Sequence, residues 1–277
     1  MRVKFVDVDG VRTRYYEAGD GPMLLLIHGA AMAADVWIRT LDPLADRFRV
    51  VAPDLLGNGF TGAGDYRGGP PHPYYVRHLF GLLDAIGIDR FAAAGSSLGA
   101  LIAALLYFEA PRRVTGLVFV GSGSTLTTDE ALMRHSTARA YANGRTAFLD
   151  MSYEDCRRRM NNIVADPGSV PESLVLMQLT ANSLPGALDA YDVRMQGLMD
   201  IEATRPYRVG DRLGEIDVPV LAVLGRNDPR GRYEQAVADF ARLPMARIET
   251  MERCGHYPQL EHPEEFNAMI RDFLAAP

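Results

Sequence analysis

The chain has 277 residues, of which 48% are hydrophobic and 23% charged, and it carries a formal net charge of −6 at pH 7. This composition is typical of a globular protein with one large core, and the acidic balance gives no electrostatic reason to expect nucleic acid or an anionic membrane as a partner. The first residues alternate like a strand, and no apolar run reaches the roughly 20 residues of a membrane span. Cys156 and Cys254 lie far apart, without metal-binding spacing. We therefore expect a cytoplasmic protein with neither a metal nor another cofactor.

Strands and helices alternate along most of the chain. The opening predicts a β-hairpin, with strands at 3–8 and 12–18 around the turn Asp9-Gly10. Later apolar runs predict buried strands, and the segments between them have helical spacing. The predicted strands are 23–29, 49–55, 91–95, 114–123, 218–228 and 246–251, and the predicted helices are 36–48, 74–88, 98–111, 232–243 and 263–276. This alternation predicts an α/β fold with a mostly parallel, doubly wound sheet.

The alternation lapses between residues 123 and 206, where the patterns are helical and rich in methionine. We predict that residues 123–206 form a helical cap inserted into a core of residues 1–122 and 207–277. Flexible apolar side chains suit an irregular apolar ligand, although each of them can equally serve packing between the cap helices. They are Met133, Tyr141, Phe148, Met151, Met160, Met177, Tyr191, Met195 and Met199. The charged run CRRRM at 156–160 is expected to be a solvated face and not an anion-binding site.

Residues 95–99, Gly-Ser-Ser-Leu-Gly, match the pattern G-x-S-x-G between a predicted strand and a predicted helix. In such a nucleophile elbow the central serine, Ser97, occupies a strained turn, and the flanking glycines let the backbone segments approach. The alternative is a serine that only caps the helix. The N–H of Leu98 can face a developing oxyanion, with the N–H of Ala30 as the second donor and that of Ala31 as the alternative.

A catalytic serine requires a base and a carboxylate that orients the base. His256 lies in the loop before the last helix, and Asp228 closes a predicted strand, so that Ser97, Asp228 and His256 all follow strand ends at one edge of the sheet. His262 is the alternative base, but its position near the start of the predicted final helix favours His256 as the catalytic base. His28 is interpreted as a brace of the loop that follows its strand. The sequence therefore predicts a serine hydrolase.

The chain resembles the α/β-hydrolase superfamily over nearly its whole length, through HGAA, VVAPDLLGNGFT, GSSLGA, VLAVLGRNDP and CGHYPQLEHPEEFN in this order. It is most similar to the meta-cleavage-product hydrolases, which cleave a carbon–carbon bond in vinylogous diketones, and to related esterases. The resemblance implies the α/β-hydrolase fold. Trp37 fits the family pattern. By contrast, Ser96 and Arg39 replace asparagines, Gln178 replaces an arginine that holds the substrate carboxylate, and Tyr257 replaces a tryptophan.

These departures indicate that the catalytic residues are those of the family, whereas the substrate differs. The main hypothesis is hydrolysis of an ester or lactone of a mainly apolar small molecule, aromatic compounds included. One alternative is carbon–carbon bond hydrolysis of a vinylogous diketone, and further ones are a lyase, a cofactor-independent oxygenase, or a protein that only binds its ligand. We expect a small-molecule substrate and leave the oligomeric state open, with a homodimer among the candidates. Candidate substrate-binding residues are Ala31, Trp37, Arg39, Ser96, Phe148, Met177, Gln178 and Tyr257. Arg39 is either a substitute for the missing cation or an arginine of the surface.

Overall fold

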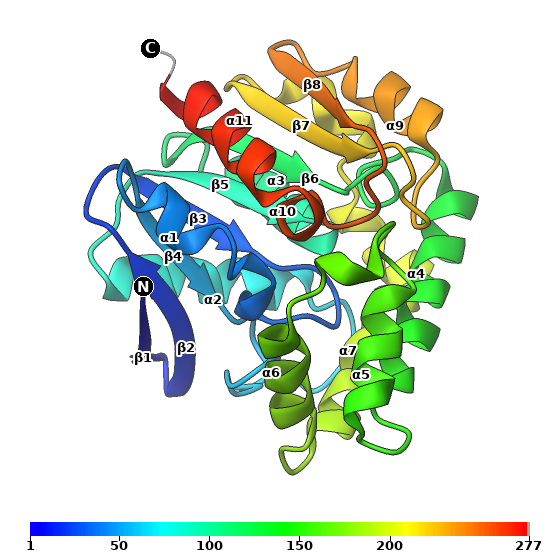
Figure 1. Cartoon of the computed structure of the whole chain (residues 1–277). Coiled ribbons are helices and arrows are strands. Elements are labelled where there is room, and N and C mark those ends of the chain that lie inside the picture. Colours follow the sequence, from blue (N-terminus) through cyan, green and yellow to red (C-terminus); the bar gives the residue numbers. More distant parts are fainter. Residues whose placement is uncertain (276–277) are drawn as a thin grey trace.

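The computed structural model describes residues 1–275 and shows an eight-stranded sheet between two layers of helices (Figure 1). The strand order is β1-β2-β4-β3-β5-β6-β7-β8, in which only the pairs β1–β2 and β2–β4 are antiparallel. The strands are β1 (Arg2–Val8), β2 (Val11–Ala18), β3 (Met23–Ile27), β4 (Arg49–Pro53), β5 (Phe91–Ser96), β6 (Val114–Val120), β7 (Val220–Gly225) and β8 (Ala246–Met251). The predicted α/β fold with a mostly parallel sheet is confirmed.

The central strands are buried on both faces, as their apolar runs predict. Every residue of β3, β5 and β7 is buried. One apolar cluster packs α2 (His72–Ala85), α3 (Leu98–Glu109) and α9 (Tyr233–Phe240) on one face of the sheet. A second cluster packs α1 (Leu41–Leu44), α10 (Pro258–Glu261) and α11 (Pro263–Ala275) on the other face. The predicted last helix, 263–276, corresponds to α11, and residue 276 lies outside the described residues.

The predicted helix at 36–48 is wrong, because the chain there forms only the short 3₁₀ helix η1 (Ala34–Trp37) followed by α1. Pro43 explains the break: a continuous helix would need an N–H at this position to bond the Arg39 carbonyl, and the proline ring would collide with that carbonyl. The Arg39 carbonyl instead accepts a hydrogen bond from Asn267 Nδ2 at 2.9 Å. A link to the C-terminal helix thus replaces a helical turn.

Five α-helices lie between β6 and β7: α4 (Glu130–Thr146), α5 (Tyr153–Asn161), α6 (Glu172–Asn182), α7 (Ala187–Met199) and α8 (Ile201–Thr204). Figure 1 shows α4 to α7, in green to yellow-green, gathered beside the edge of the sheet. Side chains from these helices meet the residues that follow β3 and β5. We call this helical layer the cap. Within residues 1–275, none of the helices combines the length and the hydropathy needed to cross a membrane.

Candidate active site

The turn between β5 and α3 has the geometry of a strained elbow. Ser97 has φ 55° and ψ −117°, and its N–H donates to the Val120 carbonyl at 2.8 Å. A Cβ on Gly95 would lie 2.1 Å from the Gly99 carbonyl oxygen, and a Cβ on Gly99 would lie 2.2 Å from the Ile27 carbonyl oxygen. Only glycine fits at either place. The Ser97 side chain makes no capping hydrogen bond to α3, so the alternative of a simple helix cap is wrong.

His256 and Asp228 lie together beside this elbow. His256 Nδ1 is 2.9 Å and 3.0 Å from the two carboxylate oxygens of Asp228, and the imidazole is only 4% exposed. An Nδ1–H that donates to the carboxylate leaves Nε2 as the basic nitrogen. His256 lines one cavity together with Ser97. His262, the rival base, lies outside that cavity, with Nε2 3.4 Å from the Arg253 carbonyl oxygen.

The loop after β3 closes over the serine from the other side. A Cβ on Gly29 would lie 3.2 Å from Ser97 Cβ, so this loop passes in contact with the elbow. Ala30 and Leu98, the two expected oxyanion donors, both line a cavity with Ser97. Ala31 follows with φ 58°, in the left-handed region that a residue with a Cβ rarely adopts. The arrangement can present two backbone amides to an oxygen that acquires negative charge beside Ser97.

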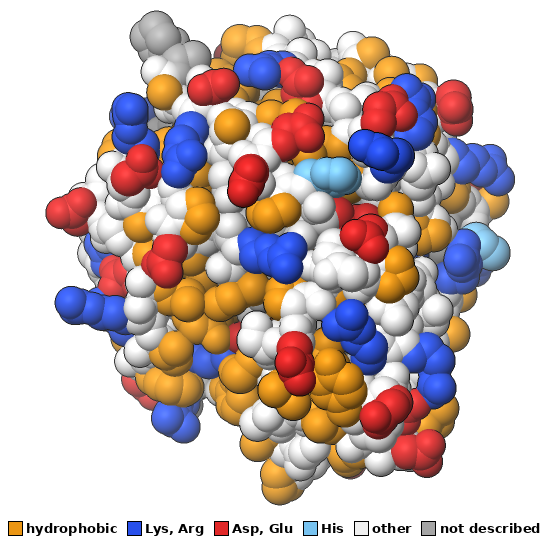
Figure 2. Space-filling model, in the orientation of Figure 1, with side chains coloured by type: hydrophobic (Ala, Val, Ile, Leu, Met, Phe, Trp, Pro, Cys, Tyr) orange, Lys and Arg blue, Asp and Glu red, His pale blue; other side chains and the backbone are white. Residues whose placement is uncertain are grey.

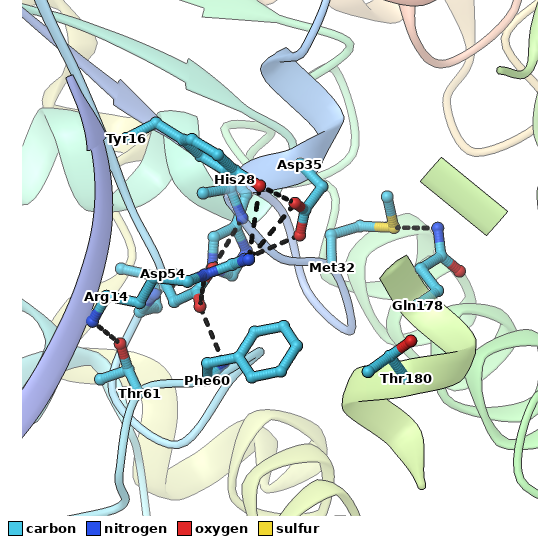
Figure 3. A network of polar contacts seen from close by, with 12 residues as sticks. Arg14, Tyr16, His28, Met32, Asp35, Asp54, Phe60, Thr61, Gln178 and Thr180 are labelled. Carbon is cyan, nitrogen blue, oxygen red and sulfur yellow. Dashed lines mark hydrogen bonds and ion pairs between the residues drawn. The ribbon is translucent and has the colours of Figure 1, made fainter. Parts of the chain in front are cut away.

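A buried carboxylate, Asp54, fixes this loop to two other segments (Figure 3). It accepts hydrogen bonds from Arg14 Nε and Nη2, both at 2.7 Å, from the Ala34 N–H at 2.9 Å and from the Phe60 N–H at 2.8 Å. Arg14 also donates to Asp35 at 2.7 Å. Because breaking a fully buried charged network is strongly unfavourable, β2, the loop after β3 and the loop at 57–63 are held as one rigid unit.

His28, directly after β3, also holds this loop in place, as its position at the strand end indicates. Its Nε2 accepts the Leu55 N–H at 2.9 Å, and its Nδ1 lies 2.8 Å from the Gly29 carbonyl oxygen. Burial lowers the pKa of His28 to about 4, so the neutral imidazole is the form that fits. His28 therefore braces the loop and does not contact the cavity beside Ser97.

Three cavities meet at the site. The catalytic cavity contains Ser97, His256 and Tyr257 in its wall, and the apolar cavity extends from Ser97 between α3 and the cap. The outer cavity, of about 400 Å³, lies between the loop at 57–63 and the helices α6 and α7. Ala31 and Arg159 line both the catalytic and the outer cavity, and so mark the boundary between them.

Arg159, in the run expected to be solvated, is only 4% exposed, so that prediction is wrong for this residue. Its Nη1 donates to Gln178 Oε1 at 2.6 Å, and its Nη2 donates to the Ala31 carbonyl. Spacing could have revealed it, because Cys156, Arg159 and Met160 share one face of α5 and all three are buried. The neighbouring Arg158 is the exposed member of the run.

Arg230 is the second cation that the sequence analysis missed. It follows Asp228 by two residues, is 9% exposed and lines the catalytic cavity. Its backbone N–H donates to Asp228 at 2.8 Å, while within residues 1–275 its Nη1 has no hydrogen-bond partner. Burial lowers the pKa of this guanidinium from its ordinary value, since a buried cation loses hydration. Within residues 1–275, the wall of the catalytic cavity thus carries two guanidinium groups and no acidic side chain.

The candidate substrate-binding residues divide into two groups. Tyr257 lines the catalytic cavity, Phe148 and Gln178 line the outer cavity, and Ala31 lines both. Trp37, Arg39, Ser96 and Met177 line none of the three.

Packing explains these corrections. Trp37 is fully buried against Phe266, with ring centroids 6.2 Å apart. Arg39 Nη1 donates to the Leu260 carbonyl at 2.8 Å, so the substitute cation lies outside the site. Ser96 is fully buried as the last residue of β5. Met177 is half-buried on α6, where its neighbour Gln178 takes the position toward the cavity.

Known proteins share this fold. The chain is 29% identical over 282 residues to a 2-hydroxy-6-oxononadienedioate/2-hydroxy-6-oxononatrienedioate hydrolase of Paraburkholderia xenovorans (strain LB400), covering 99% of this chain and 94% of the relative. The structure is similar to the 2-hydroxy-6-oxo-6-phenylhexa-2,4-dienoate hydrolase from Rhodococcus sp. strain RHA1, with a TM-score of 0.83 at 24% identity, covering 99% of this chain and 100% of that one. It is also similar to a membrane phospholipase A, with a TM-score of 0.80 at 25% identity, covering 99% and 86%. A model of the Alpha/beta hydrolase family matches residues 24–269, and the chain therefore belongs to this family of hydrolases.

Proposed function

We propose that the protein is a serine hydrolase that cleaves a carbon–carbon bond in an acidic vinylogous diketone, with Ser97 as nucleophile, His256 as general base and acid, and Asp228 as the group that orients His256. The observation that carries this proposal is the pair of buried guanidinium groups, Arg159 and Arg230, in the cavity of Ser97 and His256. Buried cations without an acidic partner favour an anionic ligand. The curated relative named above acts on dienedioates, which are acids of this kind.

The contact between Arg159 and Gln178 supports the same substrate class. The family pattern places the carboxylate-binding arginine where this chain has Gln178. Here Arg159, on the neighbouring helix, donates to that glutamine at 2.6 Å. A guanidinium is thus supplied to the same part of the cap from another position in the sequence, and it can serve the same carboxylate.

The reaction needs only groups of this chain and water. His256 first takes the proton of the dienol hydroxyl and delivers it to the carbon beside the ketone, which converts the dienol into its keto form and leaves His256 neutral. Ser97 then attacks the ketone carbon as His256 takes its proton, and the amides of Ala30 and Leu98 stabilise the oxyanion. The carbon–carbon bond breaks with its electron pair passing to the dienolate fragment, which is protonated. Water finally releases the acyl group from Ser97 as a carboxylic acid.

Hydrolysis of an ester or lactone is the second candidate function. The apolar cavity favours it, because this cavity extends from Ser97 among side chains that suit a neutral acyl or alcohol group: Leu101, Met133, Ala140, Met195 and Leu198. Such a substrate would use the same three catalytic residues. It would give Arg159 and Arg230 nothing to bind, which is why we place it second.

Steady-state turnover of a small panel separates the two functions. The panel is a 2-hydroxy-6-oxo-dienoate, a neutral short-chain aryl ester and a lactone, each with the wild type, Ser97→Ala and Arg159→Met. We expect preferred turnover of the dienoate, its loss by about 10⁴-fold or more in Ser97→Ala, and a raised KM for the dienoate alone in Arg159→Met. Faster turnover of the aryl ester, unaffected by Arg159→Met, would favour ester hydrolysis instead. Equal activity of wild type and Ser97→Ala would remove Ser97 as the nucleophile.

A further inference from the structure

The apolar cavity includes a buried histidine in its wall. Ser97 and His72 both line this cavity, whose volume is about 60 Å³. His72 is the first residue of α2 and lies between Pro71 and Pro73, whose rings restrict the backbone on both sides of it. Because a single water molecule needs about 10–15 Å³ of such space, the cavity can take a chain of a few heavy atoms that begins at Ser97. His72 belongs to the wall that such a chain would meet.

The imidazole of His72 is buried without a hydrogen-bond partner. It is 3% exposed, and among residues 1–275 no group bonds to its Nδ1. Its ring stacks on that of Tyr207, with centroids 5.2 Å apart and 9° between the planes, a contact that uses neither nitrogen. Burial lowers the pKa of His72 to about 4. The ring is therefore neutral near pH 7, with one nitrogen that can donate a hydrogen bond and one that can accept it.

Most other polar side chains in the wall of this cavity already have partners. Apart from Ser97, its serine and threonine hydroxyls each bond within the chain; they are those of Thr125, Ser136, Thr137 and Thr204. Arg208 pairs with Glu130 at 2.7 Å, although its Nε is buried and has no partner in the described part of the chain. On the face shown in Figure 2, in contrast, charged side chains of both signs lie at the surface, where water hydrates them. The cavity thus offers unused hydrogen-bonding capacity but no uncompensated charge.

The proposed reaction determines which part of the substrate enters this cavity. Ser97 attacks the ketone carbon, and the carboxylate end of the substrate belongs to the catalytic cavity, where Arg159 and Arg230 lie. The other substituent of the ketone then occupies the apolar cavity, which also includes Ser97. For the identity of this substituent, the inference rests on the proposed function.

We propose that His72 is a specificity-determining residue that binds a neutral hydroxyl group at the end of this substituent. A hydroxyl suits a neutral imidazole, because it can donate to one ring nitrogen or accept from the other. A carboxylate does not suit the cavity, because the charge of Arg208 is already compensated by Glu130. An apolar wall alone would favour a methyl group over a hydroxyl. The sign of the preference between these two groups therefore reports on His72.

Two matched series of substrates test this role. Both are 2-hydroxy-6-oxo-dienoates whose ketone carries a straight chain, ending in a hydroxyl or in a methyl group, over several short lengths. At the length that fits best, we expect the wild type to prefer the hydroxyl by about 10-fold in kcat/KM, as for one added hydrogen bond. His72→Phe keeps an aromatic ring for the stack on Tyr207 but removes both nitrogens, so it should prefer the methyl group by about 10-fold. A wild type that prefers the methyl group at every length, or a His72→Phe variant that still prefers the hydroxyl, would overturn the proposal.

Two further variants separate hydrogen bonding from packing. His72→Asn retains a donor and an acceptor at this position, so it should keep part of the preference for the hydroxyl; a preference for the methyl group as strong as that of His72→Phe would contradict the proposed hydrogen bond. His135→Phe is the matched control, because it makes the same substitution at an exposed histidine of the cap, outside the cavity. It should keep the wild-type preference, and a loss there would mean that the preference does not arise at His72.

A binding experiment keeps the role of His72 testable if none of the dienoates is turned over, an outcome that would remove the proposed function but not the binding role. The acids that hydrolysis would release from the two series can be titrated calorimetrically into the wild type and His72→Phe without any reaction. The wild type should bind the hydroxy acid more tightly by about 10-fold, and His72→Phe should bind the methyl-terminated acid more tightly. Equal binding of the two acids by the wild type, or no detectable binding of either, would overturn the binding role itself.

Discussion

The functional groups at the edge of the sheet and those of the cap are held in place by different kinds of contact. At the sheet edge, backbone geometry fixes the reactive groups: a Cβ on Gly95 or Gly99 would lie within 2.2 Å of a carbonyl oxygen, and Ser97 is held in a strained conformation between them. In the cap, Arg159 and Arg194 face cavities because neighbouring helices bury them. The first kind of constraint acts between backbone atoms at the elbow, and the second acts between the side chains of packed helices.

This difference suggests a division of labour. Residues at the sheet edge are tied to the core, through contacts such as that of Asp54 with Arg14, so their substitution should affect folding and rate together. The cap arginines make fewer structural contacts, so their substitution should change which substrate is bound. Each of the following predictions tests this separation.

The largest expected effect is on the stability of the core. Gly99→Ala would place a Cβ 2.2 Å from the Ile27 carbonyl oxygen, which neither backbone segment can avoid. We expect the free energy of unfolding to fall by about 4 kcal/mol. Gly116→Ala, in β6, is the control, because its added Cβ has no neighbour closer than 3.6 Å. Urea denaturation measures both; similar losses for the two variants would show that the elbow is not sterically constrained.

The next effect concerns the cap. Exchanging the residues of the Arg159–Gln178 pair would return the guanidinium to the position expected from the family pattern. Arg159→Gln alone should lower kcat/KM for the dienoate by about 10- to 100-fold with little change in kcat. The double variant Arg159→Gln, Gln178→Arg should recover most of this loss. A double variant as weak as the single one would mean that Arg159 acts through its bond to the Ala31 carbonyl and not by binding the carboxylate.

The same contrast explains what could be predicted from the sequence. The strands, the elbow and the meeting of His256 with Asp228 follow from short motifs and from the rule that parallel strands end at one edge, and the structure places these groups together. The predicted substrate-binding roles of Trp37 and Arg39 are wrong because a family pattern identifies aligned positions and does not show whether a side chain is buried elsewhere. Arg194, like Arg159, could have been found from helical spacing, because Tyr191, Arg194, Met195 and Leu198 share one buried face of α7.

The pH dependence of the free energy of unfolding tests whether His28, which holds the loop after β3 in place, is neutral in the folded protein. The pKa of buried His28 is about 4, below its value of about 6.5 when unfolded, so the unfolded chain binds more protons between these values. Stability is therefore complete above about pH 6.5 and falls as the pH falls, by about 2 kcal/mol for this residue at about pH 5. His28→Gln should reduce the slope by about 1.4 kcal/mol per pH unit.

Buried His72 and His78, with pKa values also lowered to about 4 by burial, should maintain a remaining slope in that variant. His135→Gln is the control, since His135 is exposed and should leave the slope unchanged. Denaturation at several pH values measures all three proteins. An unchanged slope in His28→Gln would mean that His28 is not held neutral by its contacts with Leu55 and Gly29.

The smallest expected effect is that of substituting Arg39, a cation that lies outside the active site. Its guanidinium bonds the Leu260 carbonyl at 2.8 Å, and its own carbonyl accepts from Asn267, so both ends join η1 and α1 to the C-terminal helices. Arg39→Met removes only the first of these bonds. It should lower the free energy of unfolding by about 1 kcal/mol and leave kcat/KM for the dienoate within about 2-fold of the wild type. A 10-fold loss of kcat/KM with unchanged stability would show that Arg39, a cation of the core, also reaches the substrate. The functional separation between the sheet edge and the cap would then no longer hold.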